Sequence, residues 1–254
     1  MQEDFKNKVV LVTGATGGMG KAIAEAFARQ GAAVVLSGRD VKKGEDLAEE
    51  LGAFNANILF IPGDVAIAGD NRKLILEAVK KFGRLDLLSL NAGVLGLGPV
   101  TSLPLETWDQ TWQTNVSSVF YLCKYALPEM VKNKSGSIVI NASIAAFRSF
   151  PNHPAYCASK AAAVALARQM AVDYGPQIRV NAICPGPVDT PLLWDSAVAF
   201  DPPETAVDAA RQATLMQRLG QPADIAELVL FLSSERASWI TGTAIRIDGG
   251  ILNA

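Results

Sequence analysis

The sequence predicts a doubly wound α/β fold, with a mostly parallel sheet of seven strands and helices on both faces. Along its 254 residues, short apolar runs rich in β-branched residues alternate with longer helical stretches. The runs are mostly apolar throughout, which is typical of strands buried on both faces of a parallel sheet. A glycine-rich turn joins the first run to the first helix. Together these observations predict this fold class.

The predicted elements follow one another in regular order. The first strand, 9–13, is a continuous apolar run, and the next helix, 18–30, carries Ile23 and Phe27 on its buried side and ends at Gly31. Further strands are predicted at 33–37, 58–61, 85–90, 137–142, 179–183 and 243–247. Further helices are predicted at 41–51 and near 70–82, 104–132, 156–175 and 222–233.

Residues 187–215 interrupt this alternation between a strand and the last helix. The segment is rich in proline, aspartate and alanine. A long excursion within a compact domain is usually a lid or a binding loop. We therefore expect one domain over residues 1–254, with a mobile substrate-binding flap at about 187–215.

The composition excludes several classes of partner. Half of the residues are hydrophobic, 19% are charged and the formal net charge is −2, which leaves no basic surface for nucleic acid or an anionic membrane. No run of about 18 apolar residues could span a bilayer. Residues 1–6 are polar and mixed in charge, unlike a secretory signal. We expect a cytoplasmic protein.

The cysteines and the histidine give further limits. Cys123, Cys157 and Cys184 are an odd number, widely spaced and without a C-x-x-C pair, which favours buried thiols in a reducing compartment. The single histidine, His153, argues against a protein-ligated zinc. We expect no metal site.

The turn Thr13–Gly20 has the glycine spacing Gly-x3-Gly-x-Gly, formed by Gly14, Gly18 and Gly20. Glycines let the backbone approach a pyrophosphate closely, and a helix N-terminus presents unpaired N–H groups to its negative charge. A glycine-rich turn can also be only a tight turn. The strand before it and the helix after it favour dinucleotide binding.

The end of the second predicted strand indicates which dinucleotide is bound. A site for NAD(H) would carry a carboxylate here to bond the adenine ribose, but this chain has Gly38 followed by Arg39. A guanidinium can grip a 2′-phosphate through two parallel hydrogen bonds. Asp40 is adjacent and could repel that phosphate. We predict NADP(H), with NAD(H) as the alternative.

Eight short motifs occur in order along the chain, and they resemble those of the single-domain short-chain dehydrogenase/reductases, whose fold is of the Rossmann type. The motifs are Thr13-Gly14-x3-Gly18-x-Gly20, Asp64-Val65, Asn91-Ala92-Gly93, Asn115, Ser143, Tyr156-x3-Lys160, Pro185-Gly186 and Asp248-Gly249-Gly250. The resemblance implies a catalytic tetrad of Asn115, Ser143, Tyr156 and Lys160, and it implies a homotetramer. The expected cofactor contacts are Gly14, Thr16, Gly18, Met19, Gly20, Arg39, Asp64, Val65, Asn91, Ala92, Gly93, Tyr156, Lys160, Pro185, Gly186, Val188 and Thr190.

The tetrad residues suit hydride transfer, in which the cofactor moves the hydride and the protein must move a proton. Tyr156 can donate or accept it if its pKa falls from about 10 towards the working pH. Lys160 lies four residues on, so it shares a helix face with Tyr156 and favours the phenolate. Ser143 is suited to bond the substrate oxygen. Asn115 is a poor helix former, and the resemblance implies a local distortion holding a water that relays protons to Lys160.

The pocket is expected to be mostly apolar, which favours a neutral secondary alcohol or ketone over a polyanionic substrate. Its expected residues are Val94, Leu95, Ile144, His153, Leu192, Leu193 and Trp194. A 3-oxoacyl-carrier-protein reductase is an alternative, and Lys134 could then be a basic residue near the entrance for an acidic carrier. Gln177 stands where a second basic residue would be expected, so a general carbonyl reductase is favoured. A non-catalytic NADP(H)-binding sensor or scaffold is a further alternative, which the intact Ser143, Tyr156 and Lys160 disfavour.

Overall fold

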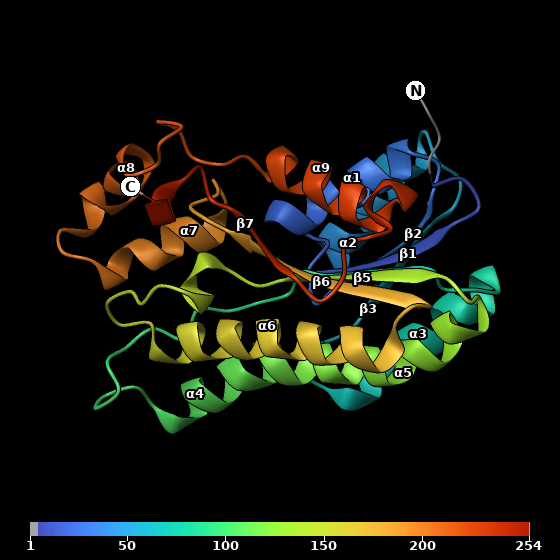
Figure 1. Cartoon of the computed structure of the whole chain (residues 1–254), viewed down its shortest axis with the longest axis horizontal. Helices are drawn as coiled ribbons and strands as arrows, with labels where there is room; N and C mark the ends of the chain where they lie inside the picture. Colours follow the sequence, from blue (N-terminus) through green and yellow to red (C-terminus); the bar gives the residue numbers. More distant parts are fainter. Residues whose placement is uncertain (1–4, 254) are drawn as a thin grey trace.

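The computed structural model describes residues 5–253; residues 1–4, part of the segment read above as unlike a signal, and residue 254 lie outside the described residues. Seven strands form one sheet in the order β3-β2-β1-β4-β5-β6-β7, and every neighbouring pair is parallel (Figure 1). The strands are β1 (Val9–Thr13), β2 (Ala33–Gly38), β3 (Ile58–Pro62), β4 (Leu87–Leu90), β5 (Gly136–Asn141), β6 (Ile178–Pro185) and β7 (Ala244–Ile247). The predicted fold class is confirmed.

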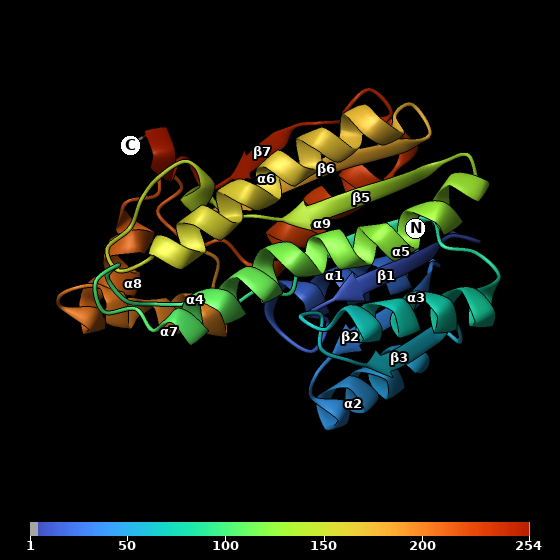
Figure 2. The ribbon, with the colours of Figure 1, turned by 90° about the horizontal axis from the view of Figure 1, so that it is seen from below.

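Helices cover both faces of the sheet. On one face lie α1 (Gly18–Arg29), α2 (Val41–Gly52) and α9 (Pro222–Ser233), and on the other lie α3 (Ala68–Phe82), α5 (Ser118–Lys132) and α6 (Pro154–Tyr174) (Figures 1 and 2). Successive strand residues point to opposite faces, so Val10 and Leu11 of β1 enter two different cores. Ile23 and Phe27 of α1 are fully buried, as their spacing of four residues predicts.

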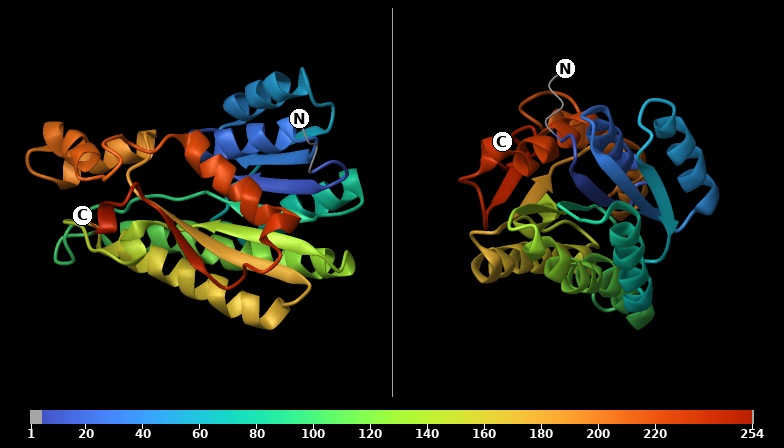
Figure 3. Two further views of the ribbon diagram at one scale, coloured as in Figure 1. Left: turned by 45° about the horizontal axis from the view of Figure 1, so that its top comes forward. Right: turned by 90° about the vertical axis from the view of Figure 1, so that its right-hand side faces the viewer.

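Three segments differ from the predictions. The expected helix 104–132 is divided into α4 (Leu105–Trp112), a π-helical turn (Gln113–Ser117) and α5. The flap at 187–215 holds two helices, α7 (Pro191–Ser196) and α8 (Pro203–Gln212), which project from one end of the sheet (Figure 3). The helix predicted from residue 156 begins at Pro154, because proline is well tolerated in a first helical turn.

The carboxyl ends of all seven strands meet at one edge of the sheet, because the strands are parallel. The glycine-rich turn follows β1, Arg39 follows β2, Asn91 follows β4 and Ser143 follows β5 by two residues. In a doubly wound sheet the ligand-binding crevice lies at this edge. Within residues 5–253, no helix combines the length and the apolar character that crossing a membrane requires.

Candidate active site

The turn after β1 is built around its glycines. Gly14 and Gly18 have φ of 62° and 51°, a left-handed conformation that glycine adopts without cost. A Cβ atom on Gly20 would overlap the carbonyl oxygen of Gly14. The N-terminus of α1 thus lies open at a cradle that side chains would fill, and this cradle fits the pyrophosphate of a dinucleotide.

The turn is held against the segment after β4. The Thr13 hydroxyl accepts hydrogen bonds from the backbone N–H groups of Asn91 and Ala92, at 3.1 and 3.4 Å. The Asn91 side chain donates to the carbonyl and hydroxyl oxygens of Ser89, both at 3.0 Å, and so braces the end of β4. This role of Thr13 was not predicted, although its place at the end of a buried strand marks it as a polar residue in need of a partner.

The end of β2 faces the same turn. Gly38 packs against the side chain of Thr16, and Arg39 is exposed, with no hydrogen bond or ion pair to any residue between 5 and 253. Asp40 caps α2 by accepting a hydrogen bond from the Lys43 N–H at 3.1 Å, and its carboxylate lies 3.5 Å from the Lys43 ammonium. The bond from the Lys43 backbone lowers the pKa of Asp40. The carboxylate that could repel a phosphate is therefore engaged by α2.

Asp64 and Val65 follow β3 beside this edge. Asp64 accepts a hydrogen bond from Ala66 N–H at 2.9 Å, and its own N–H donates to Asp70 at 2.9 Å. Val65 is buried. The Gly63 N–H donates to the Gly38 carbonyl at the end of β2. This bond holds the segment after β3 next to the end of β2.

Asn115 lies in the π-helical turn between α4 and α5, at the position where the family resemblance implied a local distortion. Its side chain accepts from the Val94 N–H and donates to the Val94 carbonyl and to the Ser159 hydroxyl, each at 2.9 Å. Ser159 in turn donates to the carbonyl of Tyr156 at 2.8 Å. Asn115 therefore ties the segment after β4 to the helix that carries Tyr156 and Lys160.

Tyr156 and Ser143 meet at the start of α6. Ser143 accepts a hydrogen bond from Ala145 N–H at 3.1 Å, which leaves its own proton free for the phenol oxygen of Tyr156. Burial raises the pKa of Tyr156 to about 12, while the bond from Ser143 acts in the opposite direction. The bond from Ser143 is thus the influence that works towards the lower pKa that proton transfer requires.

Lys160 is buried, and its ammonium donates to the carbonyl of Asn141 at 2.8 Å. It lies 5.5 Å from the ring centre of Tyr156. Burial lowers the pKa of Lys160 to about 8. Gly93 leaves room for it, because a Cβ there would lie 3.3 Å from the Lys160 ammonium nitrogen. All four predicted tetrad residues thus converge at this edge of the sheet.

A cavity of about 460 Å³ opens beside the hydroxyl groups of Ser143 and Tyr156. Five residues that were predicted to contact the cofactor line this cavity: Met19, Pro185, Gly186, Val188 and Thr190. Five residues that were predicted to contact the substrate line it as well: Leu95, Ile144, His153, Leu192 and Leu193. Phe150 and Phe200 line it too, and Phe200 belongs to the segment 187–215 that was expected to bind the substrate.

Two predicted pocket residues do not line this cavity. Val94 instead holds Asn115 through its backbone. Trp194 is 56% exposed, and its indole N–H donates to Asp189 at 2.9 Å, which turns the ring away. No cluster of three or more metal-ligating side chains is found in the part of the chain that the structure describes.

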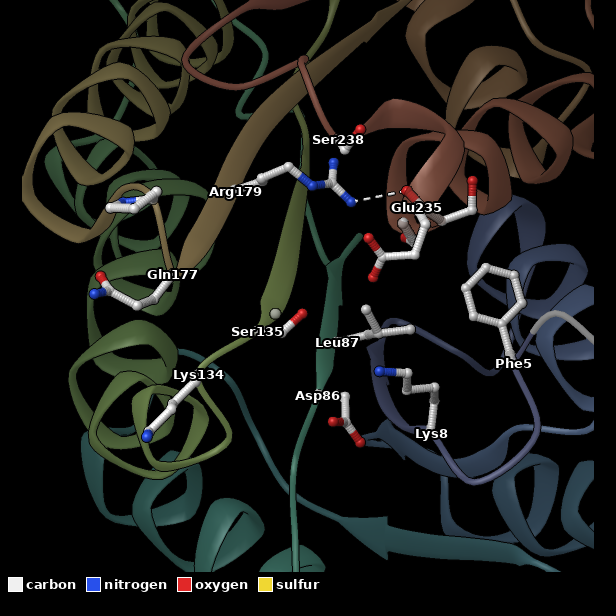
Figure 4. Close-up of a pocket in the computed structure, with 14 residues that line it drawn as sticks. Phe5, Lys8, Asp86, Leu87, Lys134, Ser135, Gln177, Arg179, Glu235 and Ser238 are labelled. Atoms are coloured by element: carbon white, nitrogen blue, oxygen red, sulfur yellow. Dashed lines mark hydrogen bonds between the residues drawn. The ribbon is translucent and has the colours of Figure 1, made fainter.

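The two residues considered for a carrier protein lie far from this cavity. Lys134 and Gln177 precede β5 and β6, beside a small pocket of about 160 Å³ at the amino ends of the strands (Figure 4). Ser143 follows the opposite end of β5. Within one chain, Lys134 is therefore not at the entrance of the catalytic cavity, and that expectation was wrong.

The fold and the site define an oxidoreductase that uses a nicotinamide cofactor. Residues 14–252 match the family described as enoyl-(acyl carrier protein) reductase. The chain is 39% identical to 2-(S)-hydroxypropyl-CoM dehydrogenase 3 of Xanthobacter autotrophicus, over 99% of each chain. The structure of levodione reductase aligns with a TM-score of 0.94 and 32% identity, covering 98% of this chain and 99% of that one. Aldohexose dehydrogenase of Thermoplasma acidophilum aligns with a TM-score of 0.88 and 33% identity, covering 100% and 97%.

The chain belongs to the short-chain dehydrogenase/reductase family. The predicted resemblance is confirmed over nearly the whole chain.

Proposed function

We propose that this enzyme interconverts a secondary alcohol and a ketone with NADP(H). The observation that carries the proposal is the pair of hydroxyl groups of Tyr156 and Ser143, which meet at a mostly apolar cavity that Met19, Pro185 and Thr190 also line. A carbonyl oxygen bound there would accept hydrogen bonds from both hydroxyls. Two similar proteins are named as dehydrogenases of hydroxypropyl-CoM and of an aldohexose, which supports a hydroxyl-bearing substrate.

The cofactor, when bound, supplies or accepts the hydride. Tyr156 donates its phenol proton to the oxygen that gains charge during reduction and accepts that proton back during oxidation. Ser143 holds the same oxygen by a hydrogen bond. Lys160 favours the phenolate through its positive charge and returns a proton to it. Asn115 acts as a positioning residue, because it ties the segment after β4 to α6.

The preference for NADP(H) is supported by the end of β2. Arg39 is exposed and without a partner among the described residues, while Asp40 is directed to Lys43 and the start of α2. A free guanidinium beside the glycine-rich turn suits a 2′-phosphate. Gly14, Thr16, Gly18 and Gly20 would hold the rest of this half of the cofactor.

We also propose a homotetramer in the cytoplasm, with residues 187–215 closing over the substrate as a flap of a single domain. Large apolar side chains stay exposed on α4, α5 and α6, which lie along one face of the molecule (Figure 2). Phe120 is 53% exposed and Val172 is 79% exposed, and these side chains favour burial by a second copy. The three cysteines are free thiols, which suits a reducing compartment. Sedimentation velocity tests the tetramer, and a monomer would contradict it.

A spectrophotometric screen tests the proposed reaction. Ketones and secondary alcohols are offered with NADPH, NADH and their oxidised forms, and we expect turnover with NADP(H). Tyr156→Phe should abolish turnover and leave cofactor binding within twofold, measured by cofactor fluorescence. Binding without turnover of any compound in the wild type would support the sensor instead, and substantial activity of Tyr156→Phe would refute its role.

A further inference from the structure

A histidine stands beside the catalytic tyrosine, and the proposed reaction does not use it. His153 immediately precedes α6, is only 4% exposed and lines the cavity that Tyr156 also lines. Its ring centre lies 6.0 Å from that of Tyr156, 6.0 Å from that of Phe150 and 5.9 Å from that of Phe200. An aromatic cage of this kind fixes the ring in one place.

The hydrogen bond at one ring nitrogen determines the tautomer. Nδ1 of His153 bonds to the carbonyl oxygen of Pro151. A carbonyl oxygen can only accept, so Nδ1 carries the proton. Burial lowers the pKa of His153 and outweighs the opposite effect of the Pro151 bond, so the ring is neutral. The other nitrogen, Nε2, therefore presents a lone pair.

Among residues 5–253, no side chain or backbone group forms a hydrogen bond with that lone pair of Nε2. The buried polar side-chain atoms that are sealed from solvent without a partner belong to Gln30, Ser37, Asn71 and Asn141. Nε2 of His153 is not one of them, so it keeps accessible surface in the cavity. A half-satisfied polar group on an apolar wall favours a ligand that brings a hydrogen-bond donor.

The other polar residues at the cavity differ from His153 in exposure. Arg148, Ser149, Asp201 and Thr205 line it as well, but all four are exposed and can remain hydrated with or without substrate. The hydroxyls of Thr190 and Ser196, which also line it, donate to the carbonyls of Val188 and Leu193. Ser143 and Tyr156 bond the reacting oxygen in the proposed reaction. His153 is thus the buried polar group left over for a second polar group of the substrate.

We propose that Nε2 of His153 accepts a hydrogen bond from a hydroxyl group on the carbon next to the reacting carbon, so that the substrates are α-hydroxy ketones and the matching vicinal diols. This inference rests on the proposed function. The rings of His153 and Tyr156 lie side by side, with their centres 6.0 Å apart, and both residues line the same cavity. A hydroxyl group bound at His153 and an oxygen bound at Tyr156 would therefore belong to nearby atoms of one small substrate.

The test compares ketones of increasing size, each prepared with a hydroxyl, a methoxy group or a hydrogen on the α-carbon. The wild type should have a kcat/KM for the hydroxy form that is about 10- to 100-fold above that of the other two. The methoxy form matters because it keeps the oxygen and lacks the donor. His153→Phe keeps an aromatic ring without an acceptor and should reduce this preference to within about threefold. His153→Gln offers an amide oxygen and should restore part of it.

The outcomes separate the two proposals. Wild-type turnover of the three forms at equal kcat/KM would overturn this inference and leave the alcohol–ketone reaction standing, whereas turnover of none of them, with either cofactor, would contradict the proposed function. A preference that survives in His153→Phe would assign the recognition to another residue. If His153→Phe fails to fold, the methoxy comparison in the wild type and the kinetics of His153→Gln decide the matter.

Discussion

The side chain of Thr16 occupies the space that a side chain at position 38 would need. A Cβ atom on Gly38 would lie 2.7 Å from Cγ2 and 3.0 Å from Oγ1 of Thr16. Because a carboxylate at this position is what an NAD(H) site uses, Thr16 and Gly38 together disfavour that arrangement. The two residues therefore act as a pair, and they should be changed as a pair.

Introducing the carboxylate alone should fail. We expect Gly38→Asp to lower the melting temperature and to leave kcat/KM with NADH no better than in the wild type, because the new side chain meets Thr16. The double variant Thr16→Ala/Gly38→Asp removes the methyl and hydroxyl groups in the way, and should raise kcat/KM with NADH by about 10-fold, as a charge-assisted hydrogen bond predicts. Equal kinetics for the single and double variants would show that Thr16 is no obstacle.

Arg39 should govern the affinity for the 2′-phosphate. We expect Arg39→Asp to lower kcat/KM with NADPH by about 10- to 100-fold, as loss of a bidentate charged pair predicts, and to leave kcat/KM with NADH within threefold. Asp40→Asn is the matched control: it removes the neighbouring charge and keeps a residue that can cap α2. NADPH kinetics unchanged by Arg39→Asp would contradict the assignment of the cofactor.

Asn115 should matter for stability as well as for rate. Asn115→Leu leaves the N–H and the carbonyl of Val94 without their partner, so we expect the free energy of unfolding to fall by about 2 to 4 kcal/mol. Ser159→Ala leaves both Val94 bonds in place and removes the Ser159 bonds to Asn115 and to the Tyr156 carbonyl, so it should cost about 1 to 2 kcal/mol. Urea unfolding measures both. A loss for Asn115→Leu no larger than that for Ser159→Ala would mean that the Val94 bonds contribute little.

Lys160 should make stability depend on pH in a direction set by its lowered pKa. Its pKa is about 8 in the folded protein against 10.5 for an ordinary lysine, so between these values the unfolded chain binds more protons than the folded one. The contribution of Lys160 to the free energy of unfolding therefore rises with pH between about 8 and 10.5, by up to about 1.4 kcal/mol per pH unit. Lys160→Met lacks this dependence.

The measurement is urea unfolding of the wild type and of Lys160→Met at several pH values between 7 and 10. We expect the variant to be inactive, yet more stable than the wild type below pH 8, with an advantage that shrinks towards pH 10. Lys81→Met, which removes an exposed lysine, is the surface control. An advantage that does not change with pH would show that the buried amine does not titrate in this window.

The fold could be predicted because its signals are local. Runs such as 9–13 and 33–37 are apolar on both faces, and this pattern alone identifies strands of a covered parallel sheet. The break at 113–117 was expected only from the family resemblance, since no glycine or proline marks it. In the folded chain Asn115 bonds to Val94, 21 residues away in the sequence. Hydrogen bonds between residues this far apart in the sequence can be identified only from the folded structure.

The residues of the site could be predicted from the sequence, but their pKa values and side-chain orientations could not. The motifs indicated Ser143, Tyr156 and Lys160, but the high pKa of Tyr156 depends on burial, which the sequence does not report. Trp194 was expected in the pocket because it is apolar, and the bond of its indole to Asp189 turns it outwards. Lys134 was judged by its charge alone, whereas its position relative to the cavity follows from the direction of β5.

The separation of the two ends of the sheet has a practical consequence for use of the protein as a biocatalyst. Lys134 is exposed beside the polar pocket at the amino ends of the strands (Figure 4). The catalytic cavity opens at the carboxyl ends. Covalent coupling of this lysine to a resin would orient the cavity towards the liquid phase. Immobilised enzyme attached there should thus keep free access for substrate and for recycled cofactor.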